Sequence, residues 1–376
     1  ALVLSIVDAR RPGIVGMPWL LALCVGLVVS LTAAATLRRV KVEPPQPIDL
    51  PGFAPARSLL LVETPGLGGD DLDLYVERGS VGAMEALQER GVRVGLEGGV
   101  PANTISLHAT LSTGQGPARH GVVSSVRYRP RGARRSFGVF PRALLLRPLL
   151  STPLWERIPV RAGDLRVPSL PGIAASLRIP LARIGVPFEA LKNPEGALSV
   201  ASEDLRAGEV IAVGSRRVRC GEESEVVERF FDPPGEDLDS SAGLGAILKA
   251  SLEADRCALD VAHAALLEGA WPLVHVRLGG HYRVAYQFAG WREDRPARGV
   301  ADREIRAYGL VLARYVRELD PQLGTLFDAA GEDALVALAS AHGIRAREDA
   351  ERLLAELIGR TAPTGTHAGT PDGVLV

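Results

Sequence analysis

The stretch best suited to chemistry is residues 101–121, PANTISLHATLSTGQGPARHG. Thr104 follows a Pro-Ala-Asn lead-in and precedes a helix-like run that ends at a Thr-Gly turn. A threonine hydroxyl can attack an electrophile, but at neutral pH it needs a base or a metal ion to deprotonate it. The structural alternative is that Thr104 caps a helix beginning near Ile105. The choice between these readings depends on which residues the rest of the chain brings to Thr104.

Strand and helix patterns alternate along the chain, and the unusual residues stand at the ends of the strands. Apolar runs predict buried strands in SLLLVET, VRVGLEGG, WPLVHVRLGG and DALVALASAHG. Apolar residues at helical spacing predict helices over 70–91, 244–268 and 302–320. This alternation predicts a doubly wound α/β fold with a mostly parallel sheet flanked by helices. Its active edge would lie at the carboxyl ends of the strands.

The composition is that of a globular protein with almost no net charge. The 376 residues are 47% hydrophobic and carry a formal net charge of -1. This length suits one large domain or two modest ones, and the charge gives no reason to expect a nucleic acid polymer as partner. The three cysteines, Cys24, Cys220 and Cys257, lack metal-ligand spacing. A disulfide between Cys220 and Cys257 is left open and would require an oxidising compartment.

Residues 17–37, MPWLLALCVGLVVSLTAAATL, contain no charged side chain and are long enough to cross the hydrocarbon core of a bilayer. They predict a transmembrane helix and a membrane location with one pass or more. Arginines stand on both sides of the segment, so the positive-inside rule does not orient it. Residues 1–16 are interpreted as a flank that holds the end of an earlier helix, and residues 38–57 as a Pro-rich linker.

The globular domain is expected to occupy residues 58–376. Within it, residues from about 127 to 243 are rich in Pro, Arg and Gly with little regular period. This texture predicts an inserted cap subdomain over the edge of the sheet. The last residues, PDGVLV, have the pattern of a strand in mid-run, so we expect a truncated C-terminus.

Four strand-end segments, VETPG, PANTISLHATLSTGQGPARHG, GGHYRVAYQF and SAHG, are followed by TGTHAGTPDGVLV. In this order and spacing they resemble the type I phosphodiesterase/nucleotide pyrophosphatase branch of the alkaline phosphatase superfamily. The resemblance runs from about Ser58 to the end of the chain. It implies an alkaline-phosphatase-like fold on the extracytoplasmic side of a membrane. It also implies phosphoester hydrolysis, in which a Thr or Ser attacks phosphorus beside two divalent metal ions, usually zinc.

The resemblance assigns seven nucleophile and metal-ligand positions, and most of the ligands are changed. The nucleophile falls on Thr104, and two imidazole ligands are kept as His342 and His367. The other four positions fall on Pro65, Tyr282, Tyr286 and Ala341. Two neutral imidazoles and a hydroxyl cannot balance the charge of two divalent ions in a partly buried cleft. We therefore expect no metal cofactor.

Two rearranged metal sites remain as alternatives. A single ion could be held by neighbouring residues that stand in for the lost ligands, namely Glu63, Asp70, Asp71 and His281. The phenolates of Tyr282 and Tyr286, together with His367, could bind ferric iron. We assign His108 and His120 to packing and hydrogen bonding.

The loss of most metal ligands favours a protein that is not an active enzyme. The leading hypothesis is a membrane-tethered, catalytically degenerate relative that acts as a scaffold or interaction subunit beside other membrane proteins. Its cleft could still bind a phosphorylated small molecule at the helix N-terminus beside Thr104. The alternative is an active metal-dependent hydrolase of phosphodiesters or nucleotides with Thr104 as nucleophile.

Overall fold

The computed structural model describes residues 57–97, 99, 103–138, 150–187, 196–221, 230, 242–347, 364–366 and 372–376. The chain divides into two units, Ala1–Pro44 and Pro45–Val376, and every described residue belongs to the second. The predicted transmembrane helix at 17–37 and its flank at 1–16 lie outside the described residues, as does the linker apart from its last residue. Within the described ranges, no helix is both long and apolar enough to span a membrane.

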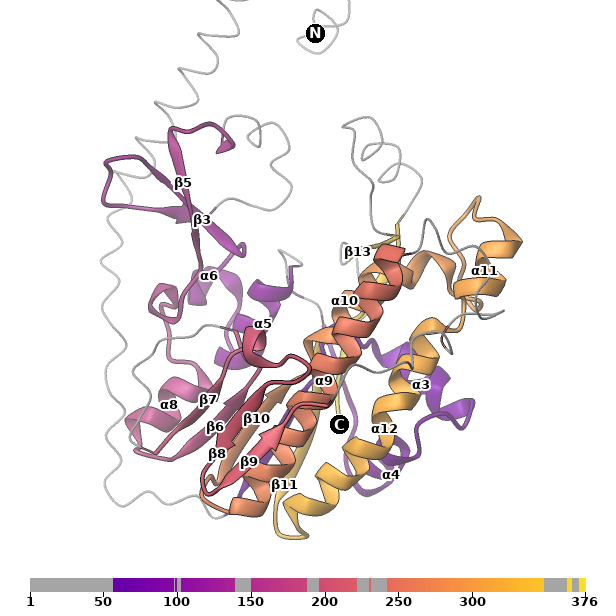
Figure 1. Ribbon diagram of the computed structural model, residues 1–376. Coiled ribbons are helices and arrows are strands. Elements are labelled where there is room, and N and C mark those ends of the chain that lie inside the picture. Colours follow the sequence, from indigo (N-terminus) through magenta and orange to yellow (C-terminus); the bar gives the residue numbers. More distant parts are fainter. Residues whose placement is uncertain are drawn as a thin grey trace, which may run out of the picture. The chain divides into compact units, whose positions relative to one another are not determined.

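The second unit is built on a seven-stranded sheet in the order β2-β14-β11-β1-β10-β6-β7 (Figure 1). The five parallel strands are β1 (Leu59–Glu63), β6 (Leu181–Ile184), β7 (Leu198–Val200), β10 (Leu273–Arg277) and β11 (Leu335–His342). Two antiparallel strands, β14 (Asp372–Leu375) and β2 (Val94–Leu96), extend one edge. The predicted α/β fold with a mostly parallel sheet is therefore confirmed.

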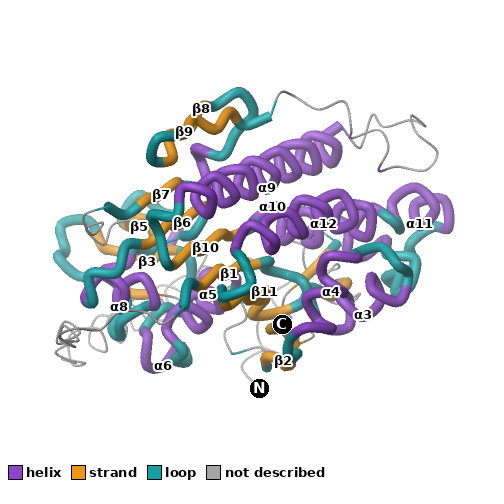
Figure 2. Tube along the Cα trace, turned by 90° about the horizontal axis from the view of Figure 1, so that it is seen from below, coloured by secondary structure: helices purple, strands orange, loops and turns teal. Residues whose placement is uncertain are grey.

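Helices cover both faces of this sheet (Figure 2). One face carries α9 (Ala242–Glu268), α10 (Gly279–Phe288) and α12 (Val311–Ala330), and the other carries α5 (Thr104–Thr113) and α8 (Leu170–Ser176). Successive residues of a strand point to opposite faces. Leu60 and Val62 of β1 accordingly belong to the large core with the first set of helices, and Leu59 packs in a smaller cluster with Leu170 of α8.

Several further elements are short. They include α3 (Gly69–Glu77), α4 (Gly82–Arg90), α6 (Pro117–His120), α11 (Asp302–Tyr308), the 3-10 turns at Ala162–Asp164, Ser202–Asp204 and Ala289–Trp291, and the pair β12 (Arg345–Ala346) and β13 (Gly365–Thr366). Two predicted helices are each divided in the structure. The first breaks between α3 and α4, where Gly79 has φ +61°. The second breaks at Gly309, where a Cβ would come within 2.5 Å of the Ile305 carbonyl oxygen.

The described part of the predicted cap, about 127–243, is not a single insertion. Its first portion forms a separate antiparallel sheet of β3 (Val126–Pro130), β4 (Phe137–Gly138) and β5 (Trp155–Pro159). Strands β6 and β7 then return to the central sheet, and β8 (Val210–Val213) and β9 (Arg216–Arg219) form a hairpin. The prediction missed β6 because Arg183 and the neighbouring prolines interrupt its apolar run, although Arg183 is buried in the sheet.

A disulfide joins Cys220, just after β9, to Cys257 in the middle of α9. Their Cα atoms are 4.8 Å apart and both side chains are fully buried. The sequence left this pairing open. In the structure the bond fastens the β8–β9 hairpin to the longest described helix.

Candidate active-site remnant

The helix that carries the predicted nucleophile begins at Thr104, and its N-cap is Asn103. The Asn103 side chain accepts a hydrogen bond from the Ser106 backbone N–H at 3.0 Å and donates one to the Val123 carbonyl at 3.0 Å. The reading of Thr104 as the helix cap is therefore wrong, because its neighbour already fills that role. The Thr104 hydroxyl oxygen is buried.

The parallel strands bring the replaced ligand positions to the same edge as Thr104. Pro65 follows the end of β1, and His342 is the last residue of the neighbouring strand β11. An isolated bridge between Gly66 and Gly343 holds the two strand ends together. The Nδ1–H of His342 donates to the Gly343 carbonyl at 2.8 Å, which leaves Nε2 as the basic ring nitrogen.

Tyr282, on α10, contacts both of the residues that keep the family chemistry. Its ring meets the His342 ring edge to face, with centroids 6.0 Å apart. Burial raises the pKa of Tyr282, and the nearby Thr104 hydroxyl offsets a smaller part of that shift. A neutral phenol therefore stands at the position where the resemblance expects a metal-binding carboxylate.

Tyr286 lies one helical turn further on and extends the same aromatic stack. The Tyr282 and Tyr286 ring centroids are 5.6 Å apart with the planes nearly parallel. The Arg347 Nη2 donates to the Tyr286 hydroxyl at 3.0 Å, and the guanidinium carbon lies 5.8 Å from the ring centroid, within cation–π range. A cation thus occupies the neighbourhood of a position that holds a metal-binding imidazole in the family.

Glu63, one of the predicted replacement ligands, belongs to a buried polar cluster. It accepts a hydrogen bond from His108 Nδ1 at 2.7 Å and one from Arg277 Nε at 3.1 Å, and His275 Nε2 lies 3.4 Å away. The Glu63 side chain is only 3% exposed. Burial alone would raise the pKa of Glu63, but the charges of His108 and Arg277 outweigh it and hold the pKa well below its ordinary value.

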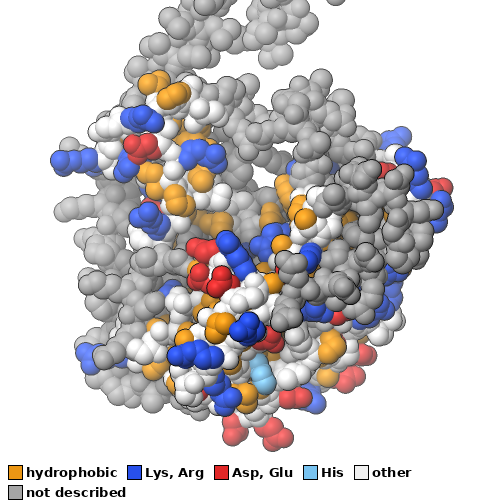
Figure 3. Space-filling model, in the orientation of Figure 1, with side chains coloured by type: hydrophobic (Ala, Val, Ile, Leu, Met, Phe, Trp, Pro, Cys, Tyr) orange, Lys and Arg blue, Asp and Glu red, His pale blue; other side chains and the backbone are white. Residues whose placement is uncertain are grey.

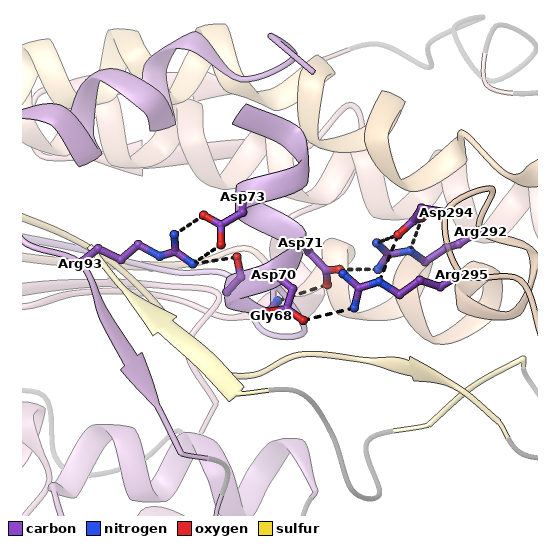
Figure 4. Close-up of polar contacts among 9 residues, drawn as sticks. Gly68, Asp70, Asp71, Asp73, Arg93, Arg292, Asp294 and Arg295 are labelled. Carbon is purple, nitrogen blue, oxygen red and sulfur yellow. Dashed lines mark hydrogen bonds and ion pairs between the residues drawn. The ribbon is translucent and has the colours of Figure 1, made fainter. Parts of the chain in front are cut away.

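The acidic residues at the start of α3 are likewise engaged elsewhere (Figure 4). Asp71 forms a buried ion pair with Arg292 and accepts a hydrogen bond from the Gly68 backbone N–H. Asp70 pairs with Arg295 at 3.4 Å. His281, the last stand-in, donates from Nδ1 to the Pro65 carbonyl at 3.1 Å. Each predicted replacement ligand therefore has a partner other than a metal ion.

The donor set around Thr104 does not fit two divalent ions. It offers the Thr104 hydroxyl, two phenols and the His342 imidazole, whereas Pro65 and Ala341 contribute no side-chain donor. In the portion of the chain that the structure describes, no group of three or more His, Cys, Asp or Glu side chains is arranged to hold a metal ion. His367 lies outside the described residues, so the ferric alternative with Tyr282 and Tyr286 stays a prediction.

The His108–Glu63–Arg277 cluster was only partly foreseen. Packing and hydrogen bonding were expected of His108, but no sequence signal marked His275 or Arg277. The one clue is the charge of Glu63 at the end of an apolar strand, because such a group is seldom buried without a partner. Its partners come from α5 and β10, which are far away in the sequence.

Comparison with known proteins gives one match by sequence and several by structure. Residues 59–168 match the family described as Type I phosphodiesterase / nucleotide pyrophosphatase. No curated protein matches the chain significantly. Two solved structures that resemble it are those of phosphonoacetate hydrolase from Sinorhizobium meliloti 1021 in complex with phosphonoacetate and with phosphonoformate. Their TM-scores are 0.44 and 0.43, with 16% and 17% sequence identity.

Each of these structural matches covers 81% of this chain, and the chain spans 62% of the length of those proteins. The sequence match begins at the first residue of β1 and includes Pro65, Thr104 and His120. For residues 59–168, that match supports the resemblance to the type I phosphodiesterase/nucleotide pyrophosphatase branch of the alkaline phosphatase superfamily.

Proposed function

We propose that this chain is a catalytically degenerate member of its family, tethered to a membrane by the helix predicted at 17–37. The folded domain would stand on the extracytoplasmic side and act as a scaffold or interaction subunit beside other membrane proteins. The observation that carries the proposal is Tyr282, whose phenol lies against both Thr104 and His342. A hydroxyl in that setting has no carboxylate-bound metal to deprotonate it.

The disulfide supports the extracytoplasmic side of the proposal. Bonds such as Cys220–Cys257 persist in oxidising compartments and are rare in the cytosol. The predicted transmembrane helix, by its length and lack of charge, supports the tether. A phosphorylated small molecule bound at the N-terminus of α5 remains a secondary part of the proposal. The free backbone N–H groups of a helix start favour anions.

The decisive experiment is an activity assay on the purified full chain with zinc or manganese and a bis(nitrophenyl) phosphodiester. We expect no metal-dependent turnover above the buffer rate. Thr104→Ala should leave this background unchanged, and bound metal measured by mass spectrometry should stay well below one ion per chain. Thr104→Ser is the matched control, because serine keeps the hydroxyl.

Turnover that requires metal, persists in Thr104→Ser and vanishes in Thr104→Ala would reject the degenerate assignment and establish the hydrolase alternative. Membrane tethering is tested separately by extraction. A chain that leaves the membrane in carbonate buffer at high pH is not anchored by a transmembrane helix. The two parts of the proposal can therefore fail independently.

A further inference from the structure

We infer that the β3–β4–β5 sheet is a docking surface for an anionic phospholipid membrane. This inference goes beyond the proposed function, because it assigns a binding role to a separate sheet that carries none of the nucleophile or ligand positions. It rests on which residues share a face of this sheet and on the charges around them.

The strand register places the aromatic side chains together. Tyr128 of β3 lies opposite Phe137 of β4 and Arg157 of β5, and Pro130 lies opposite Trp155. Directly opposed residues of antiparallel strands project from the same face. The Phe137 and Trp155 rings pack edge to face with centroids 5.6 Å apart. These residues form one aromatic face.

This aromatic face is not part of the protein core in the described residues. Tyr128, Phe137 and Trp155 belong to none of the hydrophobic clusters formed there, and each is only half-buried. Leu154, the residue before β5, is 67% exposed. Aromatic and leucine side chains that remain partly open to solvent are typical of interaction surfaces and of membrane interfaces.

Arginines are in strong excess in the strands of this sheet and in the segments next to them. The described residues between 126 and 166 include eight arginines and two carboxylates. Both carboxylates form ion pairs, Asp164 with Arg127 and Glu156 with Arg129. The remaining six are exposed and have no ion-pair partner in the described ranges: Arg131, Arg134, Arg135, Arg157, Arg161 and Arg166. Figure 3 shows blue basic side chains interspersed with orange hydrophobic ones over this part of the molecule.

The combination fits a lipid surface better than a soluble polyanion. Cationic side chains attract the anionic headgroups, and their aliphatic stems lie along the apolar boundary. Tyr128 combines an apolar ring with a hydroxyl, and the half-buried Trp155 ring adds apolar area beside it; tyrosine and tryptophan are enriched at headgroup depth. A polyanion would use the charges but would leave Leu154 and Phe137 in water.

The test uses the full chain incorporated into nanodiscs of neutral phosphatidylcholine or of the same lipid with about one quarter phosphatidylglycerol. Backbone hydrogen exchange of residues 126–138 and 154–161 is measured by mass spectrometry. We expect slower exchange in these segments on the anionic discs only, with 0.5 M salt reversing the effect because it shortens the screening length.

The diagnostic variant is Arg134→Gln/Arg135→Gln, which removes two exposed charges from the surface. It should weaken the docking equilibrium about 30-fold, since each cation at an anionic surface contributes roughly a fivefold factor. The matched control is Arg303→Gln/Arg306→Gln on α11, which removes two exposed charges elsewhere and should change nothing. The thermal midpoint of each variant checks that the fold is intact.

Equal exchange on neutral and anionic discs, or equal effects of the two variants, would overturn the proposal. Protection on neutral discs by added polyphosphate, matching that by anionic lipid, would overturn it in favour of a soluble polyanion. If the chain does not enter discs at all, the tether proposal fails. Anionic vesicles added to the same chain then test the surface on its own.

Discussion

At the residue scale, the carboxyl edge of the sheet keeps the hydroxyl of the family motif but has lost the carboxylates that would bind an activating metal ion. Thr104 retains its position at the start of α5, and His342 retains its place at the end of β11. The residues that changed became aromatic or aliphatic, so the charge that would attract a cation is gone. Glu63, a buried carboxylate that contacts α5 through His108, is neutralised by Arg277. The local chemistry now favours a stable, neutral interior.

Glu63 should therefore matter for stability. Glu63→Gln leaves the Arg277 guanidinium in the interior without a countercharge, and breaking a buried pair in this way typically costs about 3–5 kcal/mol. We expect a loss of that size in the free energy of unfolding, measured by urea denaturation at pH 7. The control is Glu156→Gln, whose pair with Arg129 is 40% exposed and should cost less than about 1 kcal/mol. Equal losses in the two variants would show that the cluster adds no particular stability.

At the element scale, α10 is positioned by a carboxylate from another helix. Asp255 of α9 accepts hydrogen bonds from the Gly280 N–H at 2.8 Å, the His281 N–H at 3.1 Å and the Tyr315 hydroxyl at 2.8 Å. A Cβ on Gly280 would come within 2.3 Å of the Tyr315 hydroxyl oxygen, so only glycine fits there. This arrangement fixes the start of the helix that presents Tyr282 and Tyr286.

The pH dependence of this contact has a definite sign. Burial raises the pKa of Asp255 to about 6, although its three hydrogen bonds act in the opposite direction. The folded state therefore holds the proton more tightly than the unfolded state does. The stability from this group is complete below about pH 4 and is lost as the pH rises through about 6. The loss is roughly 3 kcal/mol.

Urea denaturation between pH 4 and 7 measures this effect in the wild type relative to Asp255→Asn, which cannot ionise. The wild type should lose stability relative to the variant as the pH rises. Asp328→Asn, an exposed position on α12, should show no such difference. A wild type that instead gains stability relative to Asp255→Asn would show that the ionised carboxylate is the form that holds α10.

At the scale of the whole molecule, two features stand out: one disulfide bond and one sheet with an excess of positive charge. The net charge of -1 conceals the basic β3–β4–β5 sheet. The disulfide closes a loop with a sequence separation of 37 residues and ties the β8–β9 hairpin to α9.

Removing this bond should destabilise the domain. Loop-closure entropy for a loop of this size corresponds to about 4 kcal/mol, and measured values typically fall at 2–4 kcal/mol. Cys220→Ser/Cys257→Ser should lower the free energy of unfolding by about that amount, and reductant should affect the wild type alone. Thiol titration of the denatured, unreduced chain should find one free thiol, Cys24, of the three cysteines. Three free thiols would contradict the disulfide and remove its support for an extracytoplasmic location.

The strands that carry the site could be predicted because buried parallel strands have continuous apolar sequences. LLLVE and LVHVR became β1 and β10, and the family motifs located Thr104 and His342. Strand β6 was not predicted because Arg183, which is buried in the structure, interrupts its apolar sequence. The helix predicted over 70–91 is divided at Gly79, which has a positive φ. The spacing of apolar residues does not indicate such a backbone conformation. The Glu63 cluster joins segments that are far apart in sequence, so only folding brings its members together.

The central place of β1 in the sheet has a consequence for biosynthesis. Both of its neighbours lie far downstream, and Glu63 meets Arg277 of β10 across 214 residues. At about 5–20 residues per second, a ribosome needs roughly 10–40 seconds to make that intervening chain. During this interval the apolar segment LLLVE has neither hydrogen-bonding edge occupied by its native neighbours. We therefore expect this segment to need protection by chaperones during translation.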